Sequence, residues 1–436
     1  MNLFAKPSAS ISGEVICPGD KSISQRAVIL GSILNEDIAI EGFLNGEDPI
    51  STANALNAIG SSITINGTSV IIEKRNTSFK KPETEVDLGN SGTGMRLMMG
   101  LISSLNIEAT LVGDESLTKR PMLRIANPLN EMGASIACNE GKPPVKISPG
   151  KILDNYTYEM PIASAQVKSG IILSALAANK NITIIEKHPT RNHTERMISH
   201  FQGNIESIPY KAGNKISYTP SGLIASKSYE VVGDFSSAAF LIVAGLIAKE
   251  SNIVIKNVGL NPTRCGLIDV LKSMGGFIEI KNQKLTSNEE VGDIYVRSSS
   301  LRGISISGDV IPNIIDEIPI LSIAAAFAEG ETSISDAEEL RVKESDRLQA
   351  ISDGLAKINV NHELFKDGIK IAGSSKDIEV SPEIDSHGDH RIAMSFLIAS
   401  LRSTNGIFVK DCKNIFTSFP YFIDVMKTLG IDVHER

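Results

Sequence analysis

The sequence predicts an α/β fold of two lobes, each made of three repeated β-α-β-α-β units, with buried inner helices whose N-termini face an interdomain cleft. The first observation is a repeat. A polar or Gly-containing loop followed by an apolar helix occurs six times, starting at Lys21, Asn90, Ser164, Asp234, Asp316 and Asp389. Successive starts are 69, 74, 70, 82 and 73 residues apart, and so steady a period indicates an internal repeat. The other two observations are the strands and the two kinds of helix within each unit.

A short β-branched run follows the apolar helices and is typical of a strand. Examples are residues 38–40, 182–185, 253–255 and 407–409. A second, amphipathic helix comes next, and in five units a glycine ends it: Gly60, Gly133, Gly203, Gly275 and Gly430. The fifth unit instead ends near residues 357–359, and further strand-like runs, such as residues 62–65 and 277–280, close the units.

The two helices of a unit differ in polarity. Residues 170–178 and 320–328 are apolar on nearly every face, which predicts burial, whereas the mixed faces of residues 194–200 predict an outer helix. Six units divide naturally as three and three. We expect the chain to cross between lobes near Asp20 and near residues 231–233, so that one lobe spans 21–231 and the other spans 1–20 plus 232–436.

The composition is that of a globular protein, with 42% hydrophobic and 22% charged residues in 436. No stretch offers the roughly 18 apolar residues of a membrane span, and the N-terminus lacks the apolar core of a signal peptide. We therefore expect a cytoplasmic protein. Four cysteines without Cys-x-x-Cys spacing indicate buried small side chains rather than a zinc site or disulfides: Cys17, Cys138, Cys265 and Cys412.

The net charge of −8 argues against a nucleic-acid surface, yet many cations gather at junctions between loops and helices. They are Lys21, Arg26, Arg96, Lys119, Arg120, Arg124, Arg191, Arg196, Lys343, Arg347 and Arg391. An acidic protein with this distribution is expected to bind a small, multiply anionic ligand.

The loop at residues 18–26 is the clearest of these junctions. Pro18-Gly19 breaks the incoming strand, and Asp20 or Ser22 can cap the helix. Lys21 and Arg26 then lie in its first two turns, where free backbone N–H groups already favour negative charge. The alternative is a capped helix with two solvated cations. Because the arrangement repeats along the chain, we interpret it as an anion site.

The other junctions between loops and helices contain glycines or charged side chains. Gly92 and Gly94 let the backbone approach a ligand, although neither a Walker loop nor a dinucleotide motif is present. If residues 341–347 are helical, Lys343 and Arg347 share a face beside Glu344. These charges could line a ligand site, or they could simply form a solvent-exposed charged face of the helix. Residues 385–391 place two histidines and an arginine at the sixth inner helix, but further metal ligands are not evident, so we expect no metal.

Five motifs together resemble those of the 5-enolpyruvylshikimate-3-phosphate (EPSP) synthase family. They are Pro18-Gly19-Asp20-Lys21-Ser22-Ile23-Ser24-Gln25-Arg26-Ala27, Gly89-Asn90-Ser91-Gly92-Thr93, Lys119-Arg120-Pro121-Met122, Arg341-Val342-Lys343-Glu344-Ser345-Asp346-Arg347-Leu348 and Asp389-His390-Arg391-Ile392-Ala393-Met394. The resemblance covers the full length, in order. The family's fold of two lobes with three such units each matches the repeat count.

The resemblance implies transfer of the enolpyruvyl group of phosphoenolpyruvate to the 5-hydroxyl of shikimate 3-phosphate, with release of phosphate, in a monomer without a cofactor. The residues implied to bind shikimate 3-phosphate are Lys21, Ser22, Arg26, Ser164, Ala165, Gln166, Arg191, Asp316 and Lys343. Those implied to bind phosphoenolpyruvate are Lys21, Asn90, Gly92, Arg120, Gln166, Glu344, Arg347, His390 and Arg391. Bidentate arginine suits its carboxylate and phosphate.

The family's addition–elimination route passes through a tetrahedral intermediate and needs one group near the hydroxyl and one near the methylene. We assign Asp316 to the hydroxyl and Glu344 to the methylene, with Lys21 placed to share proton traffic. Neighbouring cations should keep Glu344 ionised in the free enzyme. Its role as an acid therefore requires desolvation on closure to raise its pKa.

The chain departs from the commonest family pattern at three places. Gln25 stands where His is usual, Ser164-Ala165-Gln166 replaces Ser-Ser-Gln, and the stretch before Phe419-Pro420 lacks a lysine. The last two make the chain resemble the second bacterial class, some members of which tolerate glyphosate. Gly92, however, is typical of sensitive enzymes.

Two other functions remain as alternatives. The first is the sister enzyme that modifies UDP-N-acetylglucosamine, but its reactive loop cysteine is absent from residues 112–118. The second is a non-catalytic anion-binding protein, against which Asp316 and Glu344 argue.

Overall fold

The computed structural model describes residues 1–8, 10–224, 226 and 228–436. These residues form two compact units. Unit 1 comprises Met1–Pro18, Gly233–Lys284 and Glu290–Arg436, and unit 2 comprises Gly19–Val232 and Leu285–Glu289. The lobe boundaries drawn from the sequence stay a prediction.

Unit 2 contains three of the six four-stranded sheets found in the described residues. Their strand orders are β14 (Ser228–Glu230), β3 (Ile38–Glu41), β5 (Ser69–Glu73), β4 (Ser62–Asn66); β6 (Val86–Asp87), β7 (Ala109–Val112), β9 (Lys142–Ser148), β8 (Ser135–Asn139); and β10 (Tyr156–Glu159), β11 (Ile182–Glu186), β13 (Gly213–Thr219), β12 (Asn204–Tyr210). The helices are α1 (Lys21–Leu34), α2 (Glu47–Ala58), α3 (Gly92–Ile102), α4 (Leu123–Glu131), α5 (Ala165–Ala178), α6 (His193–His200) and the 3₁₀ turn η1 (Leu117–Lys119).

Unit 1 is built in the same way. Its strand orders are β22 (Glu383–Asp385), β23 (Ile407–Lys410), β1 (Leu3–Ala5), β24 (Val433–Glu435); β16 (Phe277–Thr286), β17 (Glu289–Arg297), β15 (Glu250–Gly259), β2 (Ser10–Ile16); and β18 (Ser305–Ile306), β19 (Gly330–Ile334), β21 (Ile369–Gly373), β20 (Asn361–Leu364). The helices are α7 (Phe235–Ile247), α8 (Gly266–Ser273), α9 (Ile311–Ile314), α10 (Ile318–Ala326), α11 (Arg347–Lys357), α12 (His390–Ala399) and α13 (Phe422–Thr428), with 3₁₀ turns η2 (Gly308–Val310), η3 (Glu338–Val342), η4 (Ser400–Arg402) and η5 (Lys413–Thr417).

The predicted repeat of strands and helices is confirmed, with one added strand. In the third sheet of unit 2, β10 and β11 are parallel on either side of α5, and the outer helix α6 leads into an antiparallel hairpin, β12–β13. The corresponding hairpin β4–β5 turns at Gly67, whose φ of 61° suits glycine. The closing strand expected from the sequence is therefore half of a hairpin.

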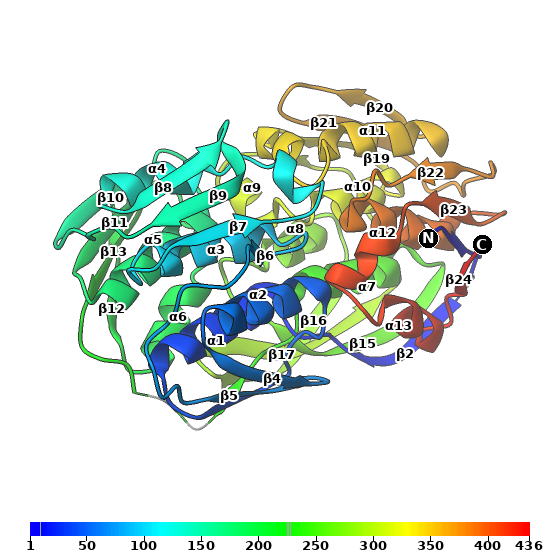
Figure 1. Ribbon diagram of the computed structural model, residues 1–436. Coiled ribbons are helices and arrows are strands. Elements are labelled where there is room, and N and C mark those ends of the chain that lie inside the picture. The colour runs from blue at the N-terminus through cyan, green and yellow to red at the C-terminus, as the bar shows by residue number, and fades with distance from the viewer. Residues whose placement is uncertain (9, 225, 227) are drawn as a thin grey trace. The chain divides into compact units, whose positions relative to one another are not determined.

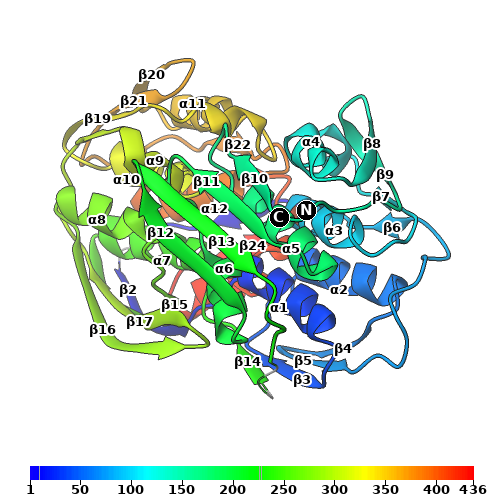
Figure 2. The ribbon, with the colours of Figure 1, turned by 90° about the vertical axis from the view of Figure 1, so that its left-hand side faces the viewer.

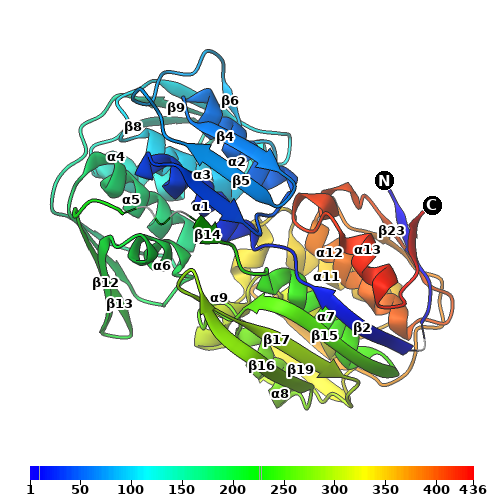
Figure 3. The same ribbon diagram turned by 90° about the horizontal axis from the view of Figure 1, so that it is seen from below.

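Strands near the two chain crossings pair outside their own repeat. β2, which precedes α1, pairs in parallel with β15 of unit 1 (Figure 3). β14, which precedes α7, pairs in parallel with β3 of unit 2. β1 lies between β23 and β24, so the two ends of the chain lie side by side (Figure 1).

Polar side chains cap most of the inner helices, and Asp20 does so for α1, as one of the two candidates from the sequence. Of the six inner helices in the described residues, five begin after an N-cap side chain that accepts a backbone N–H: Asp20, Ser91, Ser164, Asp234 and Asp389. The exception is α10. It begins at Ile318 rather than at the expected Asp316, with Glu317 at its N-cap position and no side-chain cap. The extra elements η2 and α9 precede it, and the sequence reading missed them.

The inner helices are buried, as their apolar surfaces predict. Every residue of α7 and of α10 is buried in unit 1, and in unit 2 α3 contacts both α1 and α5 (Figure 2). Among the described residues, no helix is both long and apolar enough to cross a membrane. Cys17 and Cys412 are buried as expected, but Cys138 and Cys265 are only partly buried.

Candidate active-site residues

Arg26 is the most deeply buried cation of the first motif, with 3% of its surface exposed. Its Nε donates to Thr194 Oγ1 at 2.8 Å, its Nη2 to Ser169 Oγ at 2.8 Å and its Nη1 to the Ser22 carbonyl at 3.0 Å. All three partners are neutral. Desolvation by burial lowers the pKa of Arg26 to about 10, against the opposing effect of nearby carboxylates. The guanidinium is thus a buried cation that its direct partners do not neutralise.

Lys21 is the first residue of α1, as the capped-loop interpretation predicts. Its Nζ forms an ion pair with Asp48 Oδ2 at 3.0 Å, and both side chains are largely buried. Asp48 lies in the first turn of α2, 27 residues along the chain, and sequence reasoning missed it. Its only signal was a carboxylate at the start of a helix.

Asn90, Gly92 and Arg120 come together at the start of α3. Arg120 Nη2 donates to Asn90 Oδ1 at 3.0 Å, and Asn90 Nδ2 donates to Asp114 Oδ2 at 2.7 Å. A Cβ atom at Gly92 would lie 2.8 Å from Arg120 Nη1 and 3.0 Å from Arg96 Nη1. The absence of a side chain at Gly92 therefore lets both guanidinium groups lie close to the backbone, and a larger residue would make them shift.

Gln166 joins the N-termini of α3 and α5. Its Oε1 accepts from Arg96 Nη1 at 2.9 Å, and its Nε2 donates to Thr93 Oγ1 at 2.8 Å. Ser164 and Ala165 precede it, with Ser164 as the N-cap of α5. Arg96 was noticed in the sequence only as one of the clustered cations, and here it fixes the orientation of the Gln166 amide.

Gln25 is fully buried, and its Nε2 donates to Thr52 Oγ1 at 3.1 Å and to Ser91 Oγ at 2.5 Å. Ser91 in turn caps α3 through Gly94 N–H at 2.9 Å. Gln25 therefore supports the helix start that carries Gly92. Arg191 precedes α6, is partly exposed, and lies near enough to Arg26 to lower the pKa of that residue.

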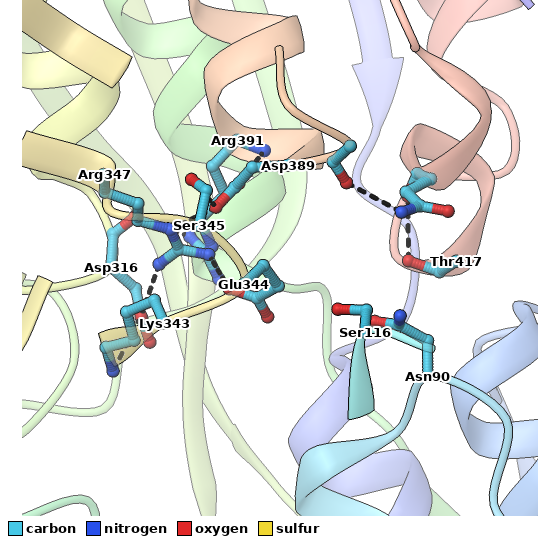
Figure 4. Close-up of polar contacts among 12 residues, drawn as sticks. Asn90, Ser116, Asp316, Lys343, Glu344, Ser345, Arg347, Asp389, Arg391 and Thr417 are labelled. Atoms are coloured by element: carbon cyan, nitrogen blue, oxygen red, sulfur yellow. Dashed lines mark hydrogen bonds and ion pairs between the residues drawn. The ribbon is translucent and has the colours of Figure 1, made fainter. Parts of the chain in front are cut away.

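In unit 1, Arg347 is surrounded by three carboxylates (Figure 4). Its Nε binds Asp389 Oδ2 at 2.8 Å, its Nη1 binds Asp316 Oδ1 at 3.2 Å, and its Nη2 contacts Glu344 Oε2. Desolvation lowers the pKa of Arg347, but the charges of Asp389, Glu344 and Asp316 together raise it above its ordinary value. Only 1% of the side chain is exposed.

The expectation that Lys343 and Arg347 share a helix face is wrong. η3 ends at Val342, and α11 begins only at Arg347, because Asp346 is its N-cap and accepts from Gln349 N–H at 3.1 Å. Lys343 nevertheless reaches the same partner as Arg347, since its Nζ lies 3.4 Å from Asp316 Oδ1. Two cations thus hold the Asp316 carboxylate.

Arg391 lies in the first turn of α12. Its Nη1 donates to the Asp316 carbonyl at 2.8 Å and lies 3.3 Å from Glu317 Oε1. Glu317 is buried and also accepts from Ser236 Oγ, and sequence reasoning missed it. Arg391 uses only Nη1 in its contacts with described residues, which leaves Nε and Nη2 for a ligand. His390, expected at the same site, is buried with 4% exposed.

A search of the described residues for three or more His, Cys, Asp or Glu side chains in a metal-binding arrangement finds none. Within the described chain, the candidate residues therefore form two groups of cations, amides and carboxylates. Each group lies within one unit.

Comparisons with known proteins show to which family the chain is similar. The family model described as EPSP synthase (3-phosphoshikimate 1-carboxyvinyltransferase) matches residues 5–426. A 3-phosphoshikimate 1-carboxyvinyltransferase of Hydrogenovibrio crunogenus is 43% identical over 438 residues, which cover 98% of this chain and 97% of that protein.

Solved structures match as well. The EPSP synthase of Acinetobacter baumannii has a TM-score of 0.87 and 39% identity, with full coverage of both chains. The enolpyruvyl transferase NikO of Streptomyces tendae has a TM-score of 0.76, covering 99% of this chain and 98% of that one. Its identity of 14% shows a shared fold only.

Proposed function

Because the chain belongs to the EPSP synthase family and has that family's 3-phosphoshikimate 1-carboxyvinyltransferase activity in the shikimate pathway, we propose how its residues divide the reaction. Unit 2 supplies most of the shikimate 3-phosphate site. The arginines of both units hold phosphoenolpyruvate. Asp316, Glu344 and Lys21 move the protons.

The proposed reaction adds and then eliminates. The 5-hydroxyl oxygen of shikimate 3-phosphate forms a bond to C2 of phosphoenolpyruvate and loses its proton, while C3 gains a proton to become a methyl group. The resulting tetrahedral phospho-ketal then breaks its C2–O bond to phosphate, and C3 returns a proton. The enolpyruvyl ether and inorganic phosphate are the products, and no oxidant or reductant takes part.

The observation that carries the shikimate 3-phosphate proposal is the buried cation Arg26. Three neutral groups bind its guanidinium, so the negative charge of a bound phosphate or carboxylate would compensate a desolvated cation. Lys21, Ser22 and Arg191 share that region of unit 2, and Ser164, Ala165 and Gln166 begin α5 beside Ser169. The N-termini of α1, α3 and α5 add backbone N–H groups that favour an anion.

Phosphoenolpyruvate is proposed to bind Arg120, Arg391 and Arg347, with Lys21, Asn90, Gly92, Gln166 and His390 nearby. The free Nε and Nη2 of Arg391 form the bidentate edge that suits a carboxylate or phosphate. Arg347 is different, since all three of its nitrogens already contact carboxylates. These contacts use three of its five N–H donors and only 1% of its side chain is exposed, so a ligand reaches it most readily by replacing one of the carboxylates.

We propose that phosphoenolpyruvate replaces Glu344 on Arg347. Glu344 is the most exposed of the three carboxylates, with 19% of its side chain accessible against 15% for Asp316 and none for Asp389. Once released, Glu344 has lost its contact with Arg347 and faces an anionic ligand, and both changes favour its protonated form. The exchange would thus supply the acid that the methylene needs, at the moment the substrate binds.

Asp316 is the proposed base for the 5-hydroxyl. Lys343 and Arg347 hold its carboxylate and keep it ionised, which is the form that accepts a proton. Asp316→Asn and Glu344→Gln should each lower turnover by roughly 10²–10⁴-fold, the range for a lost acid or base. Normal turnover in Glu344→Gln, with continued exchange of solvent deuterium into the methylene, would move the acid role to Lys21.

The proposed ligand residues are divided between unit 1 and unit 2, so we propose that ligands draw two lobes, 21–231 and 1–20 plus 232–436, together. Shikimate 3-phosphate should then compact the protein. Small-angle scattering measures the radius of gyration, and an unchanged value at saturating ligands would contradict closure. We also propose that the enzyme is a cytoplasmic monomer.

We further propose membership of the second bacterial class, which Ser164-Ala165-Gln166 and the missing lysine before Phe419 support. A phosphate-release assay tests the acceptor directly. Shikimate 3-phosphate should support turnover and UDP-N-acetylglucosamine should not. Release with the nucleotide sugar alone would favour the sister enzyme, and the same assay with glyphosate tests the class.

A further inference from the structure

A cluster of buried charges lies behind the proposed shikimate 3-phosphate site in unit 2. Lys168 of α5 is completely buried, and its Nζ contacts Glu186 Oε2 at 3.0 Å, Glu195 Oε1 at 2.8 Å and the Thr190 carbonyl at 3.2 Å. An ammonium group has three N–H donors, and these three contacts use all of them. The cluster joins α5, the end of β11 and the first turn of α6.

Glu186 fastens the loop between β11 and α6. Its Oε2 accepts from the Thr190 hydroxyl at 2.9 Å and from the Thr190 backbone N–H at 3.3 Å, and its Oε1 accepts from Asn214 Nδ2 at 3.1 Å. With the contact from Lys168 to its carbonyl, Thr190 is held at its N–H, hydroxyl and carbonyl. The next residue in the chain is Arg191.

The same helices also hold Arg26. Ser169 follows Lys168 on α5, and Thr194 precedes Glu195 on α6. The Thr194 hydroxyl donates to Ser169 Oγ at 2.8 Å, and Arg26 donates to both of these hydroxyl oxygens. The sequence neighbours of Lys168 and Glu195 thus carry the two hydroxyls that Arg26 contacts.

A buried ion cluster of this kind is costly to desolvate, and one oxygen of Glu195 is buried without a hydrogen-bond partner in the described chain. Such a cluster is weak evidence for stability and better evidence for a requirement of position. We propose that Lys168, Glu186 and Glu195 are positioning residues for shikimate 3-phosphate, acting through Arg191 and Arg26. This inference rests on the proposed assignment of those two arginines.

Thr190→Val tests the inference, because it removes one donor to Glu186 and keeps the size of the side chain. We expect the KM for shikimate 3-phosphate to rise about tenfold, as for one lost hydrogen bond to a charged group. The KM for phosphoenolpyruvate and kcat should change less than about twofold. Thr190→Ser, which keeps the hydroxyl, and the control Thr183→Val on β11, outside the cluster, should resemble the wild type.

Asn214→Ala is a second variant that removes the donor to the other oxygen of Glu186, and it should raise the same KM about threefold. Combination with Arg191→Ala separates positioning from a general structural effect. Thr190 is inferred to act through Arg191. Adding Thr190→Val to Arg191→Ala should therefore raise the KM for shikimate 3-phosphate no further.

An unchanged KM for shikimate 3-phosphate in Thr190→Val would overturn the inference. So would an equal rise for both substrates, or a rise that is additive with Arg191→Ala. If Arg191→Ala alone leaves that KM unchanged, the assignment of Arg191 under the proposed function is wrong, whatever Thr190 does.

Discussion

Arg26 of unit 2 and Arg347 of unit 1 are both buried guanidinium groups in the proposed site, with 3% and 1% of their surfaces exposed. Arg26 binds two hydroxyls and a carbonyl, whereas Arg347 binds three carboxylates. Burial therefore lowers the pKa of Arg26 to about 10, while the carboxylates raise the pKa of Arg347. The groups that bind Arg26 directly leave its charge uncompensated, whereas those that bind Arg347 already compensate it.

The difference suggests two ways of binding an anion. At Arg26 a ligand adds the missing negative charge. At Arg347 the proposed ligand exchanges with a carboxylate that the protein supplies, and the displaced group becomes available for chemistry. The same residue type thus serves as a binding site in one unit and, as proposed, as a switch for a catalytic acid in the other.

The largest expected effect is on stability. Arg347→Met would leave three carboxylates without their shared cation and should lower the free energy of unfolding by about 3–5 kcal/mol. Arg26→Met leaves Thr194 and Ser169, which already bind each other, and should cost about 1–3 kcal/mol. Urea unfolding without ligands measures both. Equal losses would mean that the charge of the partners matters less than burial.

The next effect concerns the identity of the ligands. Arg26→Ala should weaken shikimate 3-phosphate, and Arg391→Ala should weaken phosphoenolpyruvate, each by about 2–5 kcal/mol for a desolvated charge pair. Arg75→Ala is the matched control, because Arg75 contacts the Ser32 carbonyl near the other end of α1. Titration calorimetry with each substrate decides, and the opposite ligand preference would reverse the assignment.

A smaller effect is expected at Gly92. In Gly92→Ala the new methyl group would contact Arg120 and Arg96, whose guanidinium groups must then shift. We expect about a tenfold rise in the KM for phosphoenolpyruvate, or about 1.4 kcal/mol. The KM for shikimate 3-phosphate in the same variant is the control. A rise in that value alone would place Gly92 at the other substrate.

Local signals in the sequence predicted much of the fold. Asp20 caps α1 as expected, and the starts predicted at Asn90 and Ser164 lie within two residues of α3 and α5, because helix starts depend on residues within one turn. The start of the inner helix in the fifth unit was not predicted correctly. Asp316 stands in a charged pair before Ile318-Pro319, and its sequence shows neither the added α9 nor a start of α10 at Ile318.

The sequence indicated which residues are candidates for the site, but not which of them contact one another. Lys21, Arg347 and Arg391 were expected, yet their partners Asp48 and Glu317 were missed because the pairing depends on tertiary structure. Glu317 lies 74 residues from Arg391 in sequence. The four-residue spacing of Lys343 and Arg347 also led to a wrong prediction of a shared helix face. Asp346 is the N-cap of α11, so Lys343 lies outside the helix that begins at Arg347.

The most direct measurement of the proposed exchange on Arg347 is the affinity of phosphoenolpyruvate for Glu344→Gln. Both wild type and variant would be titrated in the presence of a shikimate 3-phosphate analogue that lacks the 5-hydroxyl, so that neither turns over. If the ligand displaces Glu344, removing its charge should tighten phosphoenolpyruvate binding by about two- to fivefold, the size of a partly exposed ion pair. An unchanged or weaker affinity would contradict the exchange.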